Sequence, residues 1–121
     1  MINKYITKFN SDVNKFEKII DEKIINTKVL DTDKLFIDGE LFFTDKSVLN
    51  FLEMIYVDKM IKEKYKYHYM NDKKELIFRY DNAKHHKELK TFPHHKHTQD
   101  GVSEAQEPNI EVILNEIENK I

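Results

Sequence analysis

The sequence predicts an α+β domain spanning residues 1–121: an N-terminal helix, an antiparallel sheet of five or six strands, a long histidine-rich loop and a C-terminal helix. Three observations lead to this prediction. Apolar residues first recur at steps of three and four, then alternate with polar residues as far as Asp81, and return to helical spacing after Asn109. A run of strands next to separate helices is typical of the α+β class.

The first element is a helix predicted over residues 2–20. Polar and charged residues fill the positions between its apolar residues, so the helix has one apolar face that can pack on a sheet. The residues of this face are Ile2, Tyr5, Ile6, Phe9, Val13, Phe16 and Ile20.

The sheet is predicted over residues 24–81, where the period changes to two. Its expected strands are IINTKVLD, KLFIDGELFF, SVLNFLEMIYVDKM, KYKYHYM and ELIFRYD. The third segment is long for one strand and also fits a helix, but its neighbours favour a strand. In the second segment, Asp38-Gly39 has the composition of a two-residue turn, so we expect a β-hairpin there.

Residues 82–108 have no clean period and contain both prolines, which predicts a loop. Loops longer than about 12–15 residues are usually functional or disordered. A second helix is predicted over residues 109–121, because Pro108-Asn109 can start it and an apolar face follows. That face consists of Ile110, Ile113, Leu114, Ile117 and Ile121.

The composition excludes several protein classes. There is no cysteine, so a disulfide scaffold and a thiolate metal site are excluded. Twenty basic against 22 acidic residues give a net charge of -2, which favours no particular partner. No apolar run approaches the roughly 20 residues of a membrane span. The amphipathic N-terminus does not resemble a signal peptide, so a cytoplasmic protein is expected.

Residues 64–81 predict a β-hairpin with two different faces. If Met70 pairs with Glu75, Lys66 lies opposite Arg79, with His68 diagonal to it, and these three share a charged face. This face could equally be the solvated side of a half-buried sheet. The other face carries Tyr65, Tyr67, Tyr69, Leu76, Phe78 and Tyr80, which we expect in the core under a helix. If exposed, the tyrosines would instead suit base stacking.

Five of the six histidines lie within residues 85–97, immediately after this hairpin. The loop leaves the charged face at Asp81 and can bring imidazoles to Arg79 and His68. Imidazole suits both metal binding and acid–base catalysis, because its ordinary pKa of about 6.5 lies near neutral pH. The alternative is a basic loop without a specific function that keeps the protein soluble, which is the commonest role of a segment rich in lysine and histidine.

The residues favour acid–base chemistry on phosphate over metal binding. Metal-free cleavage of RNA needs a base for the ribose 2′-OH, an acid for the leaving oxygen and cations for the developing charge. Arg79 is the only arginine beside nineteen lysines, and its planar fork suits a phosphate. The alternative is a zinc site of His95 and His97, completed by His68 or Asp81. However, HHKH matches no fixed zinc pattern, and Lys96 adds a cation.

The segment YKYHYMNDKKELIFRYDNAKHHKELKTFPHHKH resembles the core motif of the TumE family, small prokaryotic toxins of toxin–antitoxin pairs. Its three blocks fall on residues 65–68, 78–86 and 91–97, and the strand with Glu53 is also similar. The resemblance covers about two-thirds of the chain, and its last two blocks are long and specific. It implies a cytoplasmic toxin whose antitoxin is a helix-turn-helix protein, with RNA as the usual target of small toxins.

The resemblance carries no catalytic assignment, so the roles of the candidate residues follow from their chemistry. We expect a ribonuclease that needs no cofactor, in which His68 and one of the loop histidines form an acid–base pair. Arg79 would clamp the phosphate, and Asp81 would orient a histidine or hold Arg79. The candidates are His68, Arg79, Asp81, His94, His95 and His97 for catalysis, and Lys66, His85, His86 and Lys96 for substrate binding. A non-catalytic partner-binding protein and a nucleotide-modifying toxin remain alternatives.

Overall fold

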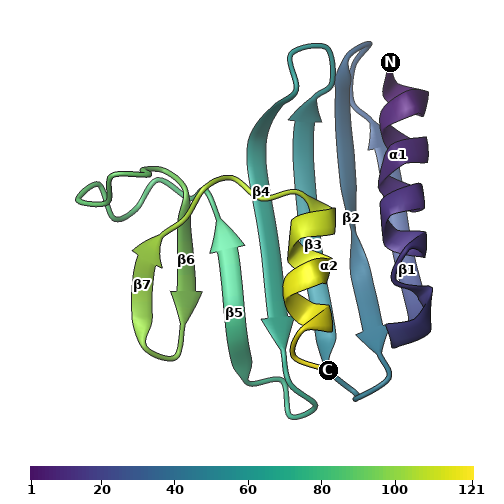
Figure 1. The fold of residues 1–121 in the computed structure, drawn as a ribbon. Coiled ribbons are helices and arrows are strands. Elements are labelled where there is room, and N and C mark those ends of the chain that lie inside the picture. The colour runs from purple at the N-terminus through teal and green to yellow at the C-terminus, as the bar shows by residue number, and fades with distance from the viewer.

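The computed structural model describes residues 1–121 and has the predicted α+β class, with two helices and one antiparallel sheet (Figure 1). The sheet has seven strands rather than five or six, and each pairs with its neighbour in chain order. The elements are α1 (Ile2–Asn14), a 3-10 turn η1 (Glu17–Ile19), β1 (Ile20–Val29), β2 (Lys34–Phe43), β3 (Val48–Tyr56), β4 (Ile61–Met70), β5 (Leu76–Asp81), β6 (His95–Thr98), β7 (Gly101–Glu104) and α2 (Ile110–Glu118).

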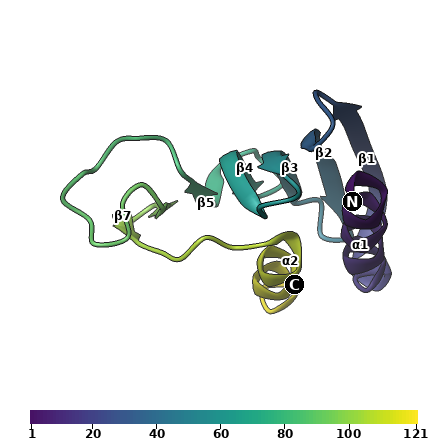
Figure 2. The same ribbon diagram turned by 90° about the horizontal axis from the view of Figure 1, so that it is seen from above.

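Both helices pack on the same face of the sheet (Figure 2). The core lies between them and the sheet, and it contains the expected apolar faces of both helices, although Ile121 is exposed. The side chain of Asn109 caps α2 by accepting a hydrogen bond from the Val112 amide at 2.9 Å. Neither helix is long and apolar enough to cross a membrane. The opposite face of the sheet has no helix over it, and we call it the open face.

The N-terminal helix is shorter than predicted, since it ends at Asn14 rather than at residue 20. The apolar spacing continues through Ile19 and Ile20, but these residues belong to the turn η1 and the start of β1. The Ile19 carbonyl accepts a hydrogen bond from the Thr44 amide at 2.9 Å. Sheet pairing therefore overrides the helical period here, and the sheet begins at residue 20 rather than at residue 24.

The hairpin predicted at Asp38-Gly39 is wrong, because both residues lie in the middle of β2. Gly39 pairs with Ile25 of β1. A Cβ atom at Gly39 would lie 1.9 Å from the Ile24 carbonyl oxygen. This glycine is therefore required for the close approach of β1, which is the other common reason for a glycine inside a strand.

The predicted register of β4 and β5 is off by two residues, so the two faces are as predicted but the partners differ. His68 lies directly opposite Arg79, and Lys66 lies opposite Asp81. The shift arises from an irregularity beside Met70 and from a longer turn, in which the Asn71 side chain accepts the amides of residues 73 and 75. The aromatic face is buried as expected, with Tyr65, Tyr67, Tyr69 and Phe78 at most 1% exposed. These tyrosines are therefore core residues and cannot stack on bases.

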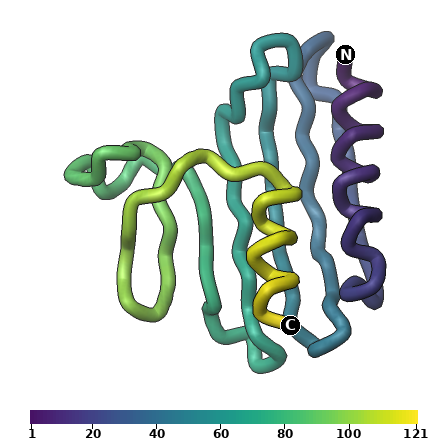
Figure 3. The backbone as a smooth tube through the Cα atoms, viewed as in Figure 1, coloured from purple at the N-terminus to yellow at the C-terminus, as the bar shows by residue number.

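The loop predicted over residues 82–108 contains two further strands. β6 pairs with β5, and β7 then forms the edge of the sheet. Residues 82–94 have no regular structure and project beyond the sheet, whereas the segment after β7 crosses over β5 and β4 to reach α2 (Figures 1 and 3). The histidine-rich sequence therefore does not end in a free loop, because its second half is fixed by strand pairing.

Candidate catalytic site

Two rows of polar side chains cross β4, β5 and β6 on the open face. The imidazole row consists of His68, Arg79 and His97, and the carboxylate row of Lys66, Asp81 and His95. Members of a row are register partners on adjacent strands, which lie about 4.8 Å apart in a sheet. The backbone thus places a guanidinium between two imidazoles, and a carboxylate between an ammonium and a third imidazole.

Asp81 is the centre of the hydrogen bonding. Its Oδ2 accepts a hydrogen bond from Arg79 Nε at 2.8 Å, and its Oδ1 accepts one from the Ala83 amide at 3.0 Å. Burial disfavours the charged carboxylate, but the Ala83 amide and the Arg79 guanidinium outweigh burial and lower the pKa of Asp81. Arg79 is held through Nε alone. Its two Nη groups make no hydrogen bond within the chain, and its side chain is 38% exposed.

His95 is fixed at both ring nitrogens. Its Nε2 lies 2.9 Å from Asp81 Oδ1, and its Nδ1 lies 2.8 Å from the Pro93 carbonyl oxygen. Its side chain is only 1% exposed. These contacts suit a residue that orients Asp81 better than one that exchanges protons with a bound molecule.

His68 and His97, the two ends of the imidazole row, have fewer partners. His68 Nδ1 is buried and makes no hydrogen bond. Burial, then Arg79 and Lys66, lower the pKa of His68. His97 Nε2 lies 3.7 Å from Asp81 Oδ2, beyond hydrogen-bonding distance. Burial lowers the pKa of His97 against the opposing effect of Asp81, so both rings are neutral at pH 7.

The structure does not bring His94 and Lys96 into this cluster. Successive residues of a strand point to opposite faces, so the two side chains lie on the helix-covered face. His94 Nδ1 is 2.9 Å from the Tyr65 hydroxyl, and its ring stacks on the Tyr65 ring. The Lys96 ammonium donates to Glu116 of α2 at 2.9 Å.

His85 and His86 lie at the margin of the cluster. The ring centroid of His86 is 5.3 Å from that of His95 and 5.8 Å from that of His97, so His86 covers both rings. His85 is exposed, its ring centroid is 6.4 Å from that of His86, and it lines a hollow together with Arg79 and His97. Lys66 lies within the carboxylate row and makes no ion pair.

Three members of the cluster have the arrangement of metal ligands. Asp81, His95 and His97 each offer a ligand atom, and these atoms lie within 4.8 Å of one another. Of the zinc set considered from sequence, His95, His97 and Asp81 therefore come together. His68 does not join them, since Arg79 separates it from His97 in the sheet.

A groove of about 680 Å³ adjoins Arg79 and Asp81 on the open face. Four lysines line it: Lys66, which the sequence analysis selected, and Lys34, Lys64 and Lys84, which it did not. The alternation of Lys64 with Tyr65 already indicated an outward lysine. No sequence pattern pointed to Lys34, because only the packing of β2 beside β3 brings it to this groove.

The helix-covered face contains a separate polar cluster around Glu53, which is fully buried. The hydroxyls of Tyr5 and Tyr67 donate to its carboxylate, and the Lys62 ammonium lies 3.5 Å away. Lys62 also donates to Tyr67 and to the Pro108 carbonyl, each at 2.8 Å. Burial and then Glu53 raise the pKa of both phenols, so they remain protonated donors.

The comparisons with known proteins agree with the resemblance seen in the sequence. No curated protein and no solved structure matches the chain. The family model described as toxin TumE matches residues 9–121, which include every strand, α2 and both rows of the open face. Membership of this family implies a toxin with an antitoxin partner. The chain belongs to the TumE family and is the toxin component of a toxin–antitoxin system.

Proposed function

We propose that this toxin is a metal-independent ribonuclease whose acid–base pair is His68 and His97. The observation that supports the proposal is the imidazole row, in which Arg79 lies between the two histidines on adjacent strands. A phosphate held by Arg79 would have one imidazole on each side. This is the geometry that in-line cleavage by a base and an acid requires.

In the proposed reaction, one neutral imidazole takes the proton of the ribose 2′-OH. The 2′-oxygen then bonds to phosphorus, and the bond from phosphorus to the 5′-oxygen breaks. The second imidazole, protonated once the anionic phosphate lies beside it, gives its proton to the leaving 5′-oxygen. The products are a 2′,3′-cyclic phosphate and a 5′-hydroxyl. Each imidazole is typically worth about 10²–10⁴-fold in rate.

The remaining cluster residues have supporting roles in this proposal. Arg79 grips the phosphate through its two free Nη groups, while Asp81 holds Nε and so fixes the plane of the fork. His95 orients Asp81. Lys66 adds positive charge to the phosphate site, and His86, which packs on His95 and His97, closes its outer side with His85 beyond it.

The decisive experiment expresses His68→Ala, Arg79→Ala and His97→Ala singly and measures growth arrest, RNA integrity and thermal stability. We expect each variant to remain folded and to lose toxicity and RNA cleavage. His94→Ala is the control, since its ring lies on the helix-covered face against Tyr65 and away from the imidazole row. If all three variants stay toxic while folded, the imidazole row is not the active site. Growth arrest without RNA cleavage would instead favour a nucleotide-modifying or partner-binding toxin.

A metal-dependent nuclease is the second candidate, because Asp81, His95 and His97 come together. The hydrogen bond between His95 Nδ1 and the Pro93 carbonyl would leave Nε2 free to bind a metal. However, the Arg79 guanidinium already neutralises Asp81 at 2.8 Å, and a divalent ion there would lie beside a fixed cation. We therefore expect the purified protein to carry no stoichiometric zinc and to keep its melting temperature in chelator. One equivalent of bound metal would reverse this ranking.

We further propose that the antitoxin is a helix-turn-helix protein that inhibits by covering the site. The surface of Arg79 and residues 84–97 carries several lysines and would attract an acidic segment. Co-purification of the toxin with the product of its neighbouring gene, followed by protection mapping, tests this. A complex that leaves Arg79 and residues 84–97 accessible would exclude inhibition by direct blockade.

A further inference from the structure

We infer that the groove beside the imidazole row binds the phosphate backbone of a single RNA strand and leads it to Arg79. The inference rests on the proposed function and extends it to residues outside the catalytic cluster. The groove crosses β2, β3, β4 and the end of β5 on the open face, and it includes Arg79 and Asp81. Any chain that occupies it therefore reaches the phosphate clamp.

A β-bulge between β3 and β4 places two consecutive charged residues on the side of the groove. Ile55 pairs with Lys62 and Met54 with Lys64, so Glu63 is the extra residue. The side chains of Lys62 and Tyr65 both point into the core. The two residues between them, Glu63 and Lys64, therefore both lie on the open face. Bulges commonly re-aim side chains in this way next to functional sites.

The acidic residues of the groove are already paired, which leaves an excess of positive charge. Glu63 Oε2 lies 2.7 Å from Lys34 Nζ, and Asp81 is held by Arg79 and His95. The unpaired cations are Lys64, Lys66 and Lys84, none of which makes an ion pair or hydrogen bond within the chain. Burial and then the proximity of Arg79 and Lys64 lower the pKa of Lys66. An anion in the groove would relieve this repulsion.

The shape and the floor of the groove suit a single strand. Half-buried Leu52 and Met54 form part of its floor, which offers apolar surface for a ribose or a base. Its volume of about 680 Å³ lies in the range of about 300–1,000 Å³ typical of small-ligand sites, so it holds a few nucleotides and cannot enclose a duplex. Lys64 and Lys66 are two residues apart on one strand, about 6.8 Å, which allows them to contact different phosphates.

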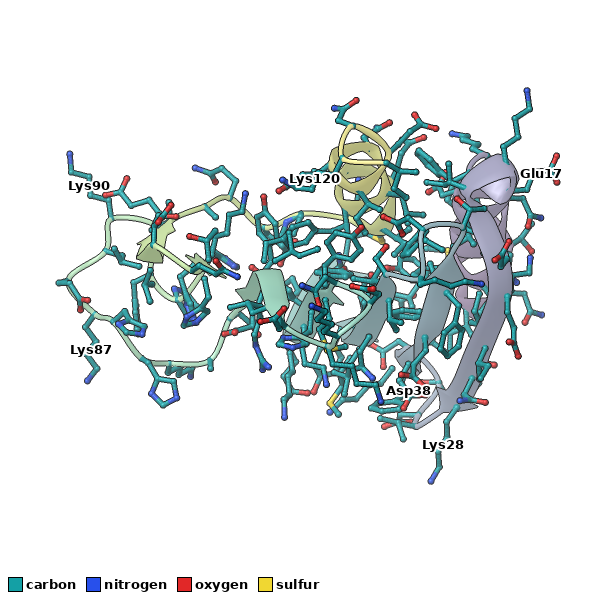
Figure 4. The ribbon with its side chains drawn as sticks, turned by 90° about the horizontal axis from the view of Figure 1, so that it is seen from below. Glu17, Lys28, Asp38, Lys87, Lys90 and Lys120 are labelled. Atoms are coloured by element: carbon teal, nitrogen blue, oxygen red, sulfur yellow. The ribbon has the colours of Figure 1, made fainter.

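The experiment measures binding of a fluorescent single-stranded 2′-O-methyl RNA to the intact protein as a function of salt concentration. The 2′-O-methyl group removes the nucleophile, so binding is separated from cleavage. The test variant is Lys64→Gln/Lys84→Gln, and the control with the same charge is Lys73→Gln/Lys120→Gln. Both control lysines are exposed, and Lys73 lies in the turn after β4. Lys120 lies just after α2, and Figure 4 shows it on the opposite side of the sheet from Lys28 and Asp38.

We expect the test variant to bind more weakly and to reduce the slope of log K against log salt by about 1.4, or about 0.7 for each lost phosphate contact. The control should bind like the unmodified protein, and duplex RNA should compete poorly. Equal weakening in both variants would show a diffuse charge effect and overturn the groove. Binding of a glutamate-rich peptide but not of RNA would also overturn it, in favour of an acidic protein segment.

A parallel assay with unmodified RNA separates this inference from the proposed function. If the lysine variants weaken binding but unmodified RNA stays intact, the groove is an RNA site and the ribonuclease proposal is wrong. If RNA is cleaved but binding is insensitive to Lys64 and Lys84, the ribonuclease proposal is retained and the groove is not the substrate path.

Discussion

The two faces of the sheet each bury a carboxylate, and the comparison separates a structural cluster from the cluster that we propose to be catalytic. Glu53 on the covered face is fully buried, and Asp81 on the open face is 4% exposed. Each accepts hydrogen bonds from several donors. A buried carboxylate with donors around it is therefore no sign of function by itself.

The difference lies in the cations beside the two carboxylates. Lys62 donates to Tyr67 and to the Pro108 carbonyl, so its ammonium is satisfied within the chain and 6% exposed. Arg79 uses only Nε, and its other donors face solvent. Donors that face solvent are hydrated and remain free to bind a ligand. The buried Nδ1 of His68 is different, because a buried polar atom without a hydrogen bond is costly unless a ligand or water supplies one.

The largest expected effect is on folding, from removing the carboxylate of the covered face. Glu53→Leu leaves Lys62 without its counterion and two phenols without an acceptor, which should cost about 3–5 kcal/mol in the free energy of unfolding. Urea unfolding measures this, with exposed Glu22→Leu as a control that should change stability by no more than about 0.5 kcal/mol. Replacing both charges, in Glu53→Leu/Lys62→Met, should recover much of the loss. A single variant as stable as the control would contradict a structural role.

The next largest effect is on activity, and it comes from replacing the guanidinium of Arg79 on the open face. Arg79→Lys keeps the charge but loses the planar pair of donors, so we expect RNA cleavage to fall by about 10²–10³-fold. The melting temperature should change little, because the side chain is partly exposed. Lys73→Arg, in the turn after β4, is the control for a conservative change at a distance. Full activity in Arg79→Lys would mean that Arg79 supplies charge and no directed hydrogen bonds.

A smaller effect should distinguish two histidines three positions apart. His94 stacks on Tyr65 and bonds its hydroxyl, so His94→Ala should lower stability by about 1 kcal/mol and leave cleavage intact. His97→Ala, on the other face, should do the reverse. Thermal unfolding and an RNA cleavage assay on the same two proteins test this pair. Loss of cleavage in a folded His94→Ala protein would place the active site on the covered side of β6.

The sequence allowed the two faces of β4 and β5 to be predicted, because alternation assigns a side chain to a face without knowledge of its partner. For this reason a two-residue error in register left His68, Arg79 and Lys66 on the correct face. The partners could not be predicted, since they depend on the irregularity beside Met70 and on the turn held by Asn71.

Two other features required tertiary information. Asp38-Gly39 has the composition of a turn, but the glycine is required by the backbone of β1, which lies far away in the sequence. The strand β6 is only four residues long and forms because β5 offers it an edge. Without that pairing, His94 and Lys96 could not be separated from His95 and His97, so all four were candidates for one site.

The smallest effect concerns the pH dependence of stability, to which His68 contributes. Its pKa in the folded chain lies below the ordinary value of 6.5, because burial, Arg79 and Lys66 disfavour its charged form. The unfolded chain therefore binds the proton first as the pH falls below 6.5. Stability contributed by the neutral ring is present above that pH and is lost as the pH falls through the lower folded pKa.

Thermal unfolding between pH 7 and pH 5 should show this loss, and His68→Gln should reduce it. His97, whose pKa is also lowered, accounts for part of what remains. Losses from Asp12 and Asp81 do not interfere, because their pKa values are lowered from 3.8 and matter only in stronger acid. An unchanged slope in His68→Gln would mean that the ring gains its missing partner in solution and is not held neutral by its place beside Arg79.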